Sequence, residues 1–204
     1  MRTGTKRICA VAWLALALGL TASAQTEHWR LSLMAGAQDG SGRGGYPSYG
    51  AHVWARSSAV ASLDATYFFG ESFGLHTGLM GSEGKFGTDF LWYPIGNEPV
   101  WTEHDFEMSY GVAEIGPEFR LKVGPKGEFY AQLNVGSTFG FSGHVDFSSR
   151  QAEHFRDGLT YSGVLGYRLF LGSHAGLAIQ GSVRRLQEPG ISVADIRAGV
   201  AFRF

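Results

Sequence analysis

Residues 193–204 read VADIRAGVAFRF, and this stretch decides the fold. Successive side chains of a β-strand point to opposite faces, so residues two apart share a face. One face of this stretch is apolar and consists of Ile196, Ala198, Val200, Phe202 and Phe204. The other face holds Arg197, Gly199, Ala201 and Arg203. The pattern predicts a strand with an apolar face and a charged face, and its apolar face includes the terminal Phe204.

The same alternation recurs along the chain. Seven further stretches show it, at residues 28–37, 59–69, 73–80, 108–122, 129–142, 159–171 and 175–184. Their lengths are close to the roughly 9–11 residues of a tilted membrane strand. The connections alternate between long loops, at 39–58, 83–107 and 143–157, and short Gly-containing turns, and the last connection, at 187–190, is of medium length. The sequence therefore predicts an all-β protein, an eight-stranded antiparallel up-and-down transmembrane barrel with short periplasmic turns and long extracellular loops.

The N-terminal residues 1–24 have the three parts of a cleaved secretory signal peptide. They comprise a basic start, an apolar run at 8–20 and the small-residue site Ala22-Ser23-Ala24. The apolar run is shorter than the roughly 20 residues of a transmembrane helix. Removal of the segment leaves residues 25–204 as one barrel domain with 14 basic and 18 acidic residues and no cysteine. This mildly acidic balance predicts no nucleic-acid partner.

The charged faces of the strands decide between two kinds of barrel. A soluble lipocalin-like barrel would line its cavity with the apolar face and turn the polar face to water. The face assigned to the interior here carries many charges, with a basic excess, and includes His76, Lys122 and Arg203. The predicted lumen charge network consists of Arg30, Asp64, Glu114, Glu118, Arg120, Arg168, Arg184 and Arg197. So many charges favour a membrane barrel with its apolar face outward.

Aromatic residues gather at one end of the predicted outer surface. If the short turns face the periplasm, a girdle at the lipid–water boundary is predicted there. Its members are Trp29, Tyr67, Phe69, Phe73, Phe119, Phe129, Tyr167, Phe202 and Phe204.

The pattern resembles the family of small outer-membrane proteins with an OmpA/OmpX-type eight-stranded barrel, which is similar to the porin family. Residues 114–141, EIGPEFRLKVGPKGEFYAQLNVGSTFGF, are similar to the central hairpin of its outer-membrane β-barrel domain branch. The last strand is similar to the C-terminal signature that the barrel assembly machinery reads, with Gly199, Phe202 and Phe204 as the expected signal. The resemblance implies a protein of the Gram-negative cell outer membrane, with lipid and that machinery as partners.

The lumen charges have two interpretations. An eight-stranded barrel is just wide enough for its own side chains to fill it, and buried charges are costly unless they are paired. The first interpretation is a structural salt-bridge plug, in which Asp64, Glu114 and Glu118 pair with the arginines. The second is a small gated pore.

Other chemistry finds less support in the sequence. His104, His144 and His154 lie near acidic residues but lack a recognisable metal-ligand spacing. Lipid A modifying enzymes of this size use a His and a Ser near the rim, and no stretch here resembles the His-x-Ser-Asn motif of the deacylase. We therefore expect no catalytic residue, no metal and no cofactor.

The long loops carry exposed aromatic residues that predict a binding surface. Trp92, Tyr93 and Trp101 lie beside Pro and acidic residues, where they could contact an extracellular ligand or an adhesion partner, or form an upper girdle. The leading hypothesis is a non-enzymatic outer-membrane barrel with a filled polar lumen and a structural or surface-binding role. A small channel is the alternative, and a lipid A modifying enzyme comes third.

Overall fold

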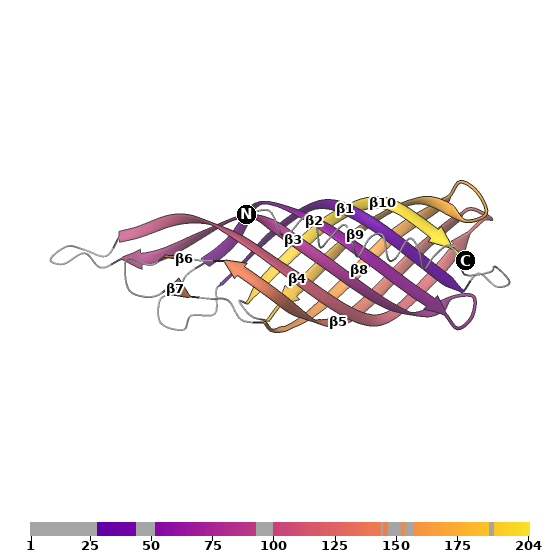
Figure 1. The fold of residues 1–204 in the computed structure, drawn as a ribbon, viewed down its shortest axis with the longest axis horizontal. Coiled ribbons are helices and arrows are strands. Elements are labelled where there is room, and N and C mark those ends of the chain that lie inside the picture. Colours follow the sequence, from indigo (N-terminus) through magenta and orange to yellow (C-terminus); the bar gives the residue numbers. More distant parts are fainter. Residues whose placement is uncertain are drawn as a thin grey trace.

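The protein is a closed barrel of eight antiparallel strands (Figure 1). The computed structural model describes residues 28–43, 52–92, 100–143, 145–146, 152–153, 157–187 and 190–204. The barrel strands are β1 (Trp29–Arg43), β2 (His52–Phe68), β3 (Phe73–Trp92), β4 (Val100–Val123), β5 (Gly127–Gly143), β8 (Leu159–Phe170), β9 (Ala175–Leu186) and β10 (Ile191–Arg203). Two short strands, β6 (Val145–Asp146) and β7 (Ala152–Glu153), pair with each other outside the barrel sheet. The expected signal peptide at 1–24 lies outside the described residues.

The first and last strands close the barrel. β1 pairs with β10 from Arg30 opposite Arg203 through to Gly42 opposite Ile191. Beyond that ladder the backbones of Trp29 and Phe204 exchange two hydrogen bonds of 3.1 Å. Both strand ends therefore lie at the end of the barrel that also carries the short turns 69–72, 124–126 and 171–174 (Figure 1). We call this the turn end and the opposite one the loop end.

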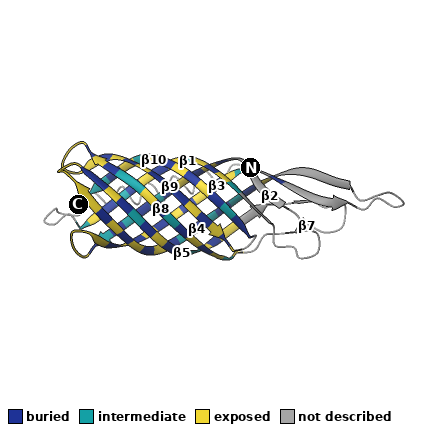
Figure 2. Cartoon of the chain, turned by 180° about the vertical axis from the view of Figure 1, so that it is seen from behind, coloured by how far each residue is buried: buried dark blue, intermediate teal, exposed yellow. Residues whose placement is uncertain are grey.

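Buried and exposed residues alternate along each strand, as Figure 2 shows in its chequered blue and yellow wall. The sequence-predicted faces are confirmed, because the exposed set is apolar and the buried set is mostly polar. The most exposed large apolar side chains include Leu133 at 72% and Leu165 at 71%. Such an inverted arrangement is expected of a barrel surrounded by hydrocarbon. No helix in the described part of the chain is long and apolar enough to cross a membrane.

The predicted long loops were too long. β3 continues to Trp92 and β4 begins at Val100, so most of the expected loop 83–107 is a paired hairpin. Likewise β1 runs to Arg43 and β2 starts at His52, which shortens the expected loop 39–58. The hairpin projects beyond the barrel at the loop end (Figure 1). Apolar alternation identifies only the part of a strand whose outer face is apolar, whereas backbone pairing continues with polar residues.

Candidate functional site: the lumen of the barrel

The lumen is filled by inward side chains, and all eight predicted members of the charge network are buried there. Two carboxylates that the sequence reasoning missed, Glu128 and Asp195, join them. The buried charges in the described chain are five arginines, Arg30, Arg120, Arg168, Arg184 and Arg197, and five carboxylates, Asp64, Glu114, Glu118, Glu128 and Asp195. The expected basic excess is therefore wrong. Lys122, also expected inside, is exposed at the turn end, and Arg203 lies half-buried at the rim.

One cluster of charges lies toward the turn end and centres on Arg168. Its Nη1 atom lies 2.6 Å from Glu118 Oε1 and 3.1 Å from Glu128 Oε1. Glu128 also accepts from Arg30 Nε at 3.1 Å and lies 3.7 Å from Arg120 Nη1. These charges come from four different strands: Arg30 lies on β1, Glu118 on β4, Glu128 on β5 and Arg168 on β8. The ion pairs therefore connect parts of the wall that are not neighbours in the sheet. Pairing of this kind offsets the cost of burying the charges.

Two uncharged side chains complete the hydrogen bonds of Glu118 within this cluster. Thr66 Oγ1 and Gln132 Nε2 each donate to its Oε2 atom at 2.7 Å. The Tyr130 ring lies below the Arg168 guanidinium, with its centroid 3.7 Å from Cζ. The carboxylate is thus both paired and hydrogen-bonded, which is the condition under which a buried charge is tolerated.

A second cluster lies toward the loop end and centres on Arg184. Its Nη2 atom lies 3.0 Å from Glu114 Oε2, and its Nη1 atom lies 3.3 Å from Asp195 Oδ2. Asp195 also accepts from Arg197 Nε at 2.8 Å. Ser162 donates to Glu114 at 3.0 Å. The predicted pairing of Glu114 with an arginine is present here, while Asp195 supplies the partner of Arg197 that the sequence reasoning had not identified.

Asp64 and His76 lie between the clusters. Asp64 accepts a hydrogen bond from Ser62 at 3.0 Å, and its Oδ1 atom lies 3.9 Å from His76 Nε2. The other ring nitrogen of His76 lies 3.2 Å from Gln132 Nε2 and 3.4 Å from Thr66 Oγ1. Gln132 and Thr66 thus contact Nδ1 of His76, while Nε2 lies on the side of Asp64. The predicted pairing of Asp64 with an arginine is absent from its described contacts.

The turn end of the lumen is closed by aromatic rings stacked with arginines. Phe68 and Phe170 are fully buried and point inward. Arg120 Cζ lies 3.7 Å from the centroid of the Phe68 ring, and Arg203 Cζ lies 4.5 Å from that of Phe170. Arg120 also donates from Nε to the Glu71 carbonyl at 2.6 Å, so it fastens a turn to the lumen. Desolvated cation–π contacts contribute about 2 kcal/mol each.

The loop end of the lumen is closed by apolar side chains instead. A buried cluster, the apolar cap, consists of Val60, Met80, Met108, Tyr110, Val112, Leu186, Ile191 and Val193. Tyr110 donates its hydroxyl to Gln38 at 2.9 Å, which satisfies the polar atom of the cap. Met80 Sδ lies 3.1 Å from Arg184 Nη1, where the cap meets the second charge cluster. The charges are therefore enclosed between an aromatic floor and an apolar cap.

The lumen offers little chemistry to a substrate. Thr66, His76 and Asp64 lie in a row that resembles a nucleophile, a base and an orienting acid, but Thr66 donates to Glu118. All three side chains are buried, so a substrate has no access to them. Among the described residues, no group of three His, Cys, Asp or Glu side chains is placed to hold a metal ion.

The predicted aromatic girdle lies at the turn end on the outer surface. Trp29, Phe69, Phe73, Phe119 and Phe129 are exposed there. The remaining members, Tyr67, Tyr167, Phe202 and Phe204, are half-buried. Neighbouring rings contact each other, with centroids 5.0 Å apart for Trp29 and Tyr67 and 4.7 Å apart for Phe129 and Tyr167. The girdle thus includes two groups of rings in contact, one formed by Trp29, Tyr67, Phe69 and Phe73 and one by Phe129 and Tyr167.

The residues of the predicted assembly signal lie along the seam that closes the barrel. Phe204 pairs with Trp29, and Phe202 lies opposite Leu31. Gly199 lies opposite Met34, and a Cβ at this position would overlap the carbonyl oxygen of Leu33. The glycine therefore allows close approach of β10 and β1, which is a structural reason for it apart from any signal.

Two of the three residues of the predicted loop surface lie in strands and not in a loop. Trp92 ends β3 and Trp101 lies in β4, opposite Leu91, so these two positions belong to the projecting hairpin and were wrongly placed in a loop. Tyr93 lies outside the described residues.

Solved structures share this architecture. Neisserial surface protein A aligns over 89% of this chain and 100% of its own, with a TM-score of 0.53 and 12% identity. OprG, an outer membrane protein of Pseudomonas aeruginosa, aligns over 87% and 97%, with a TM-score of 0.53 and 13% identity. The chain has the fold of an outer-membrane β-barrel. The predicted all-β fold, a closed eight-stranded antiparallel barrel, is confirmed, and the apolar outer surface agrees with a location in the cell outer membrane.

The fold does not separate enzymes from other barrels. The outer membrane protease OmpT of Escherichia coli also aligns, over 90% of this chain and 99% of its own, with a TM-score of 0.50 and 9% identity. No family model and no curated protein matches the sequence. Function must therefore be inferred from the site itself.

Proposed function

We propose that this protein is a non-enzymatic, non-conducting barrel of the outer membrane, which serves as a structural element and presents its loop-end hairpin for binding. The observation that carries the proposal is the enclosed lumen. Its ten charges are balanced and buried, and the apolar cap closes the loop end. An ion that entered would have to displace paired charges and cross apolar side chains, both of which are costly.

Planar-bilayer recording of the purified, refolded barrel tests the closed lumen. We expect no steady single-channel openings at moderate voltage. A variant with a weakened cap, Val112→Ser with Leu186→Ser, provides the comparison, because it replaces two fully buried apolar side chains by small polar ones. Steady openings of the unmodified barrel would overturn the proposal and favour the small gated pore.

The enzymatic alternative has its own test. Ser162, which lies on the inward face, donates to Glu114 and accepts from Asn134. The Glu114 carboxylate is itself paired with Arg184, which makes it a poor base for activating the serine hydroxyl. We therefore expect lipid A incubated with the barrel in mixed micelles to keep its acyl pattern in mass spectrometry, and a changed pattern would show that the barrel is an enzyme.

We further propose that the turn end faces the periplasm and the projecting β3–β4 hairpin faces the exterior. The supports are the short turns and the aromatic girdle at one end, and at the other end strands longer than the membrane requires. In this orientation Trp92 and Trp101 lie on the external hairpin, within reach of an extracellular ligand or adhesion partner. Protease treatment of intact cells should cut at residues 93–99 and leave the turn at 124–126 uncut.

A further inference from the structure

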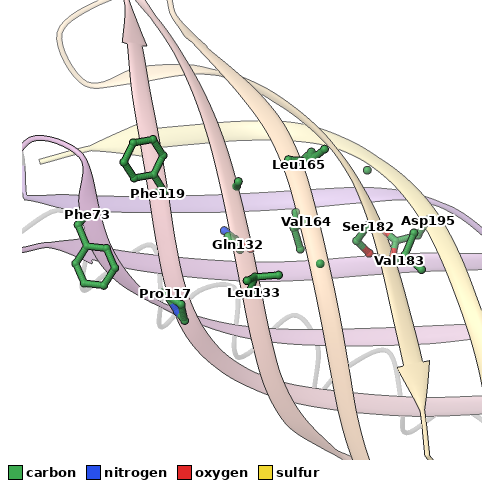
Figure 3. A pocket seen from close by; sticks show the side chains of 13 residues that line it. Phe73, Pro117, Phe119, Gln132, Leu133, Val164, Leu165, Ser182, Val183 and Asp195 are labelled. Atoms are coloured by element: carbon green, nitrogen blue, oxygen red, sulfur yellow. Dashed lines mark hydrogen bonds between the residues drawn. The ribbon is translucent and has the colours of Figure 1, made fainter.

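The barrel wall and the projecting β3–β4 hairpin differ in how the edges of their strands are used. In the wall every strand has a neighbour on both sides, because the sheet is closed. Its outward side chains are apolar, as Phe119, Leu133 and Leu165 show in Figure 3. The hairpin extends beyond this wall at the loop end (Figure 1). The barrel therefore does not pair every edge of the hairpin strands.

One edge of β4 lacks a partner strand in the described part of the chain. β4 pairs with β3 from Val100 onward, but its pairing with β5 begins only at Met108, opposite Gly143. No other described strand pairs with residues 100–107, since β6 and β7 pair only with each other. We call the β5-side edge of residues 100–107 the free edge.

The hydrogen bonds of the ladder show which backbone groups point to the free edge. The Arg120 amide donates to the Ser72 carbonyl oxygen at 2.8 Å, on the side of β3. In an antiparallel ladder successive residues bond alternately to the two neighbouring strands. The β3–β4 ladder has no register shift from Phe119 to Val100. The N–H and C=O groups of residues 101, 103, 105 and 107 therefore point to the free edge.

The sequence of the free edge is acidic. Glu103 and Asp105 share one face of β4, and the residues opposite them on β3 are Asp89 and Gly87. Like charges directly opposite each other destabilise a sheet, so Glu103 and Asp89 leave a negative charge without compensation from the facing strand. Residues 100–107 contain no Pro and no Lys, two residues with which proteins protect an edge from pairing. The free edge therefore favours an added strand that carries positive charges.

We propose that the free edge binds an extended segment of a partner protein by strand addition, and that this segment carries Lys or Arg at alternate positions. Backbone hydrogen bonds to residues 101, 103, 105 and 107 hold the segment, and ion pairs with Glu103 and Asp105 select a basic one. The inference rests on the proposed function, since it names the kind of partner that the hairpin binds.

A second copy of this chain is a poorer partner for the free edge. Antiparallel pairing of two such edges around a two-fold axis places the same face of both strands together, so Glu103 and Asp105 would oppose acidic residues. Barrels in one membrane also project their hairpins in the same direction, which excludes an antiparallel arrangement between them. A basic segment of another protein meets neither obstacle.

Amide hydrogen exchange, followed by NMR on the refolded barrel in neutral detergent micelles, tests strand addition. The probe is a short peptide of alternating Lys and Val with blocked ends. We expect it to slow exchange severalfold at Glu103 and Asp105 and to leave Thr102 and His104 unchanged, because the amides of the latter two point to β3. Methylation of every backbone nitrogen keeps the charge of the peptide but removes its donors, and this protection should then be lost.

Charge selection is tested with a pair of double variants. Glu103→Gln with Asp105→Asn should lower the affinity for the peptide severalfold. The matched control, Asp39→Asn with Glu83→Gln, removes two exposed carboxylates from the loop end outside the free edge and should leave the affinity unchanged. A boiled-versus-unboiled mobility shift verifies that each variant is folded.

The outcomes separate this inference from the proposed function. Peptide binding that leaves the amides of Glu103 and Asp105 unprotected overturns strand addition, as does slow exchange at these amides before any peptide is added. Equal weakening by both double variants overturns the selection of a basic segment by these two residues. Binding to the refolded barrel but not to intact cells supports the inference and contradicts only the external orientation of the hairpin.

Discussion

Successive residues of β5 show how differently the two faces of the wall are stabilised. The inward positions Glu128 and Gln132 are buried and joined to other strands by ion pairs and hydrogen bonds. The outward positions Phe129 and Leu133 are exposed, and hydrocarbon surrounds them in a membrane. A shift of one residue in the pairing register of β5 would exchange its inward and outward side chains. The inner face is therefore specific, since each group needs a partner, while the outer face requires only apolar character.

The largest expected effect comes from removing the central cation of the inner face. Arg168→Ala leaves Glu118 and Glu128 without their shared partner, and we expect a loss of about 3–5 kcal/mol in the free energy of unfolding. Urea titration in lipid vesicles, followed by tryptophan fluorescence, measures it. Arg185→Ala is the control: Arg185 is exposed and should cost no more than about 0.5 kcal/mol. Equal effects of the two substitutions would show that the inner pairs contribute nothing specific.

A charge introduced on the outer face should lower the free energy of unfolding nearly as much, although no ion-pair partner is removed. Leu133→Arg places a guanidinium in the lipid-facing wall, and we expect a cost of about 2–4 kcal/mol near the midplane. The same titration applies, with Leu133→Ile as the apolar control that should be close to neutral. If Leu133→Arg is tolerated, this face does not contact hydrocarbon.

A smaller effect is expected at the aromatic floor. Phe68→Leu keeps an apolar side chain but removes the ring below Arg120, and we expect a loss of about 1–2 kcal/mol. Phe69→Leu, one residue away on the outer face, replaces one exposed apolar side chain by another and should cost less. The reverse order would mean that the inside and outside of β2 are exchanged.

At the seam we expect an effect on stability no larger than that at the aromatic floor. Deletion of Phe204 removes the two backbone hydrogen bonds to Trp29, which are worth about 1 kcal/mol each. We propose that Phe204 acts mainly as an assembly signal, so the amount of folded barrel in the outer-membrane fraction should fall severalfold more than this loss explains. Normal insertion of the deletion variant would contradict that role.

The fold could be predicted because membrane strands repeat one simple rule, apolar outward and polar inward. The rule ends where the membrane ends, so the extension of β3 to Trp92 and the early start of β4 at Val100 were missed.

The lumen was predictable in its members but not in its pairing. Glu128 was missed because the fifth strand was expected to begin at residue 129. Asp195 was missed although it shares a strand face with Arg197. Which carboxylate meets which arginine depends on the stagger of strands around the barrel, which one sequence does not reveal. Val60 and Phe68, two apolar residues on the buried face of β2, belong to the cap and the floor.

Cysteine accessibility tests the enclosed lumen most directly, because the only cysteine of the sequence, Cys9, lies within the expected signal peptide. Ser162→Cys places a thiol of similar size in the lumen, and Ser173→Cys places one on an exposed turn. We predict that a charged, water-soluble thiosulfonate modifies the thiol at 173 in the folded barrel and modifies the thiol at 162 only after unfolding. Equally fast modification of both thiols in the folded barrel would contradict the enclosed lumen.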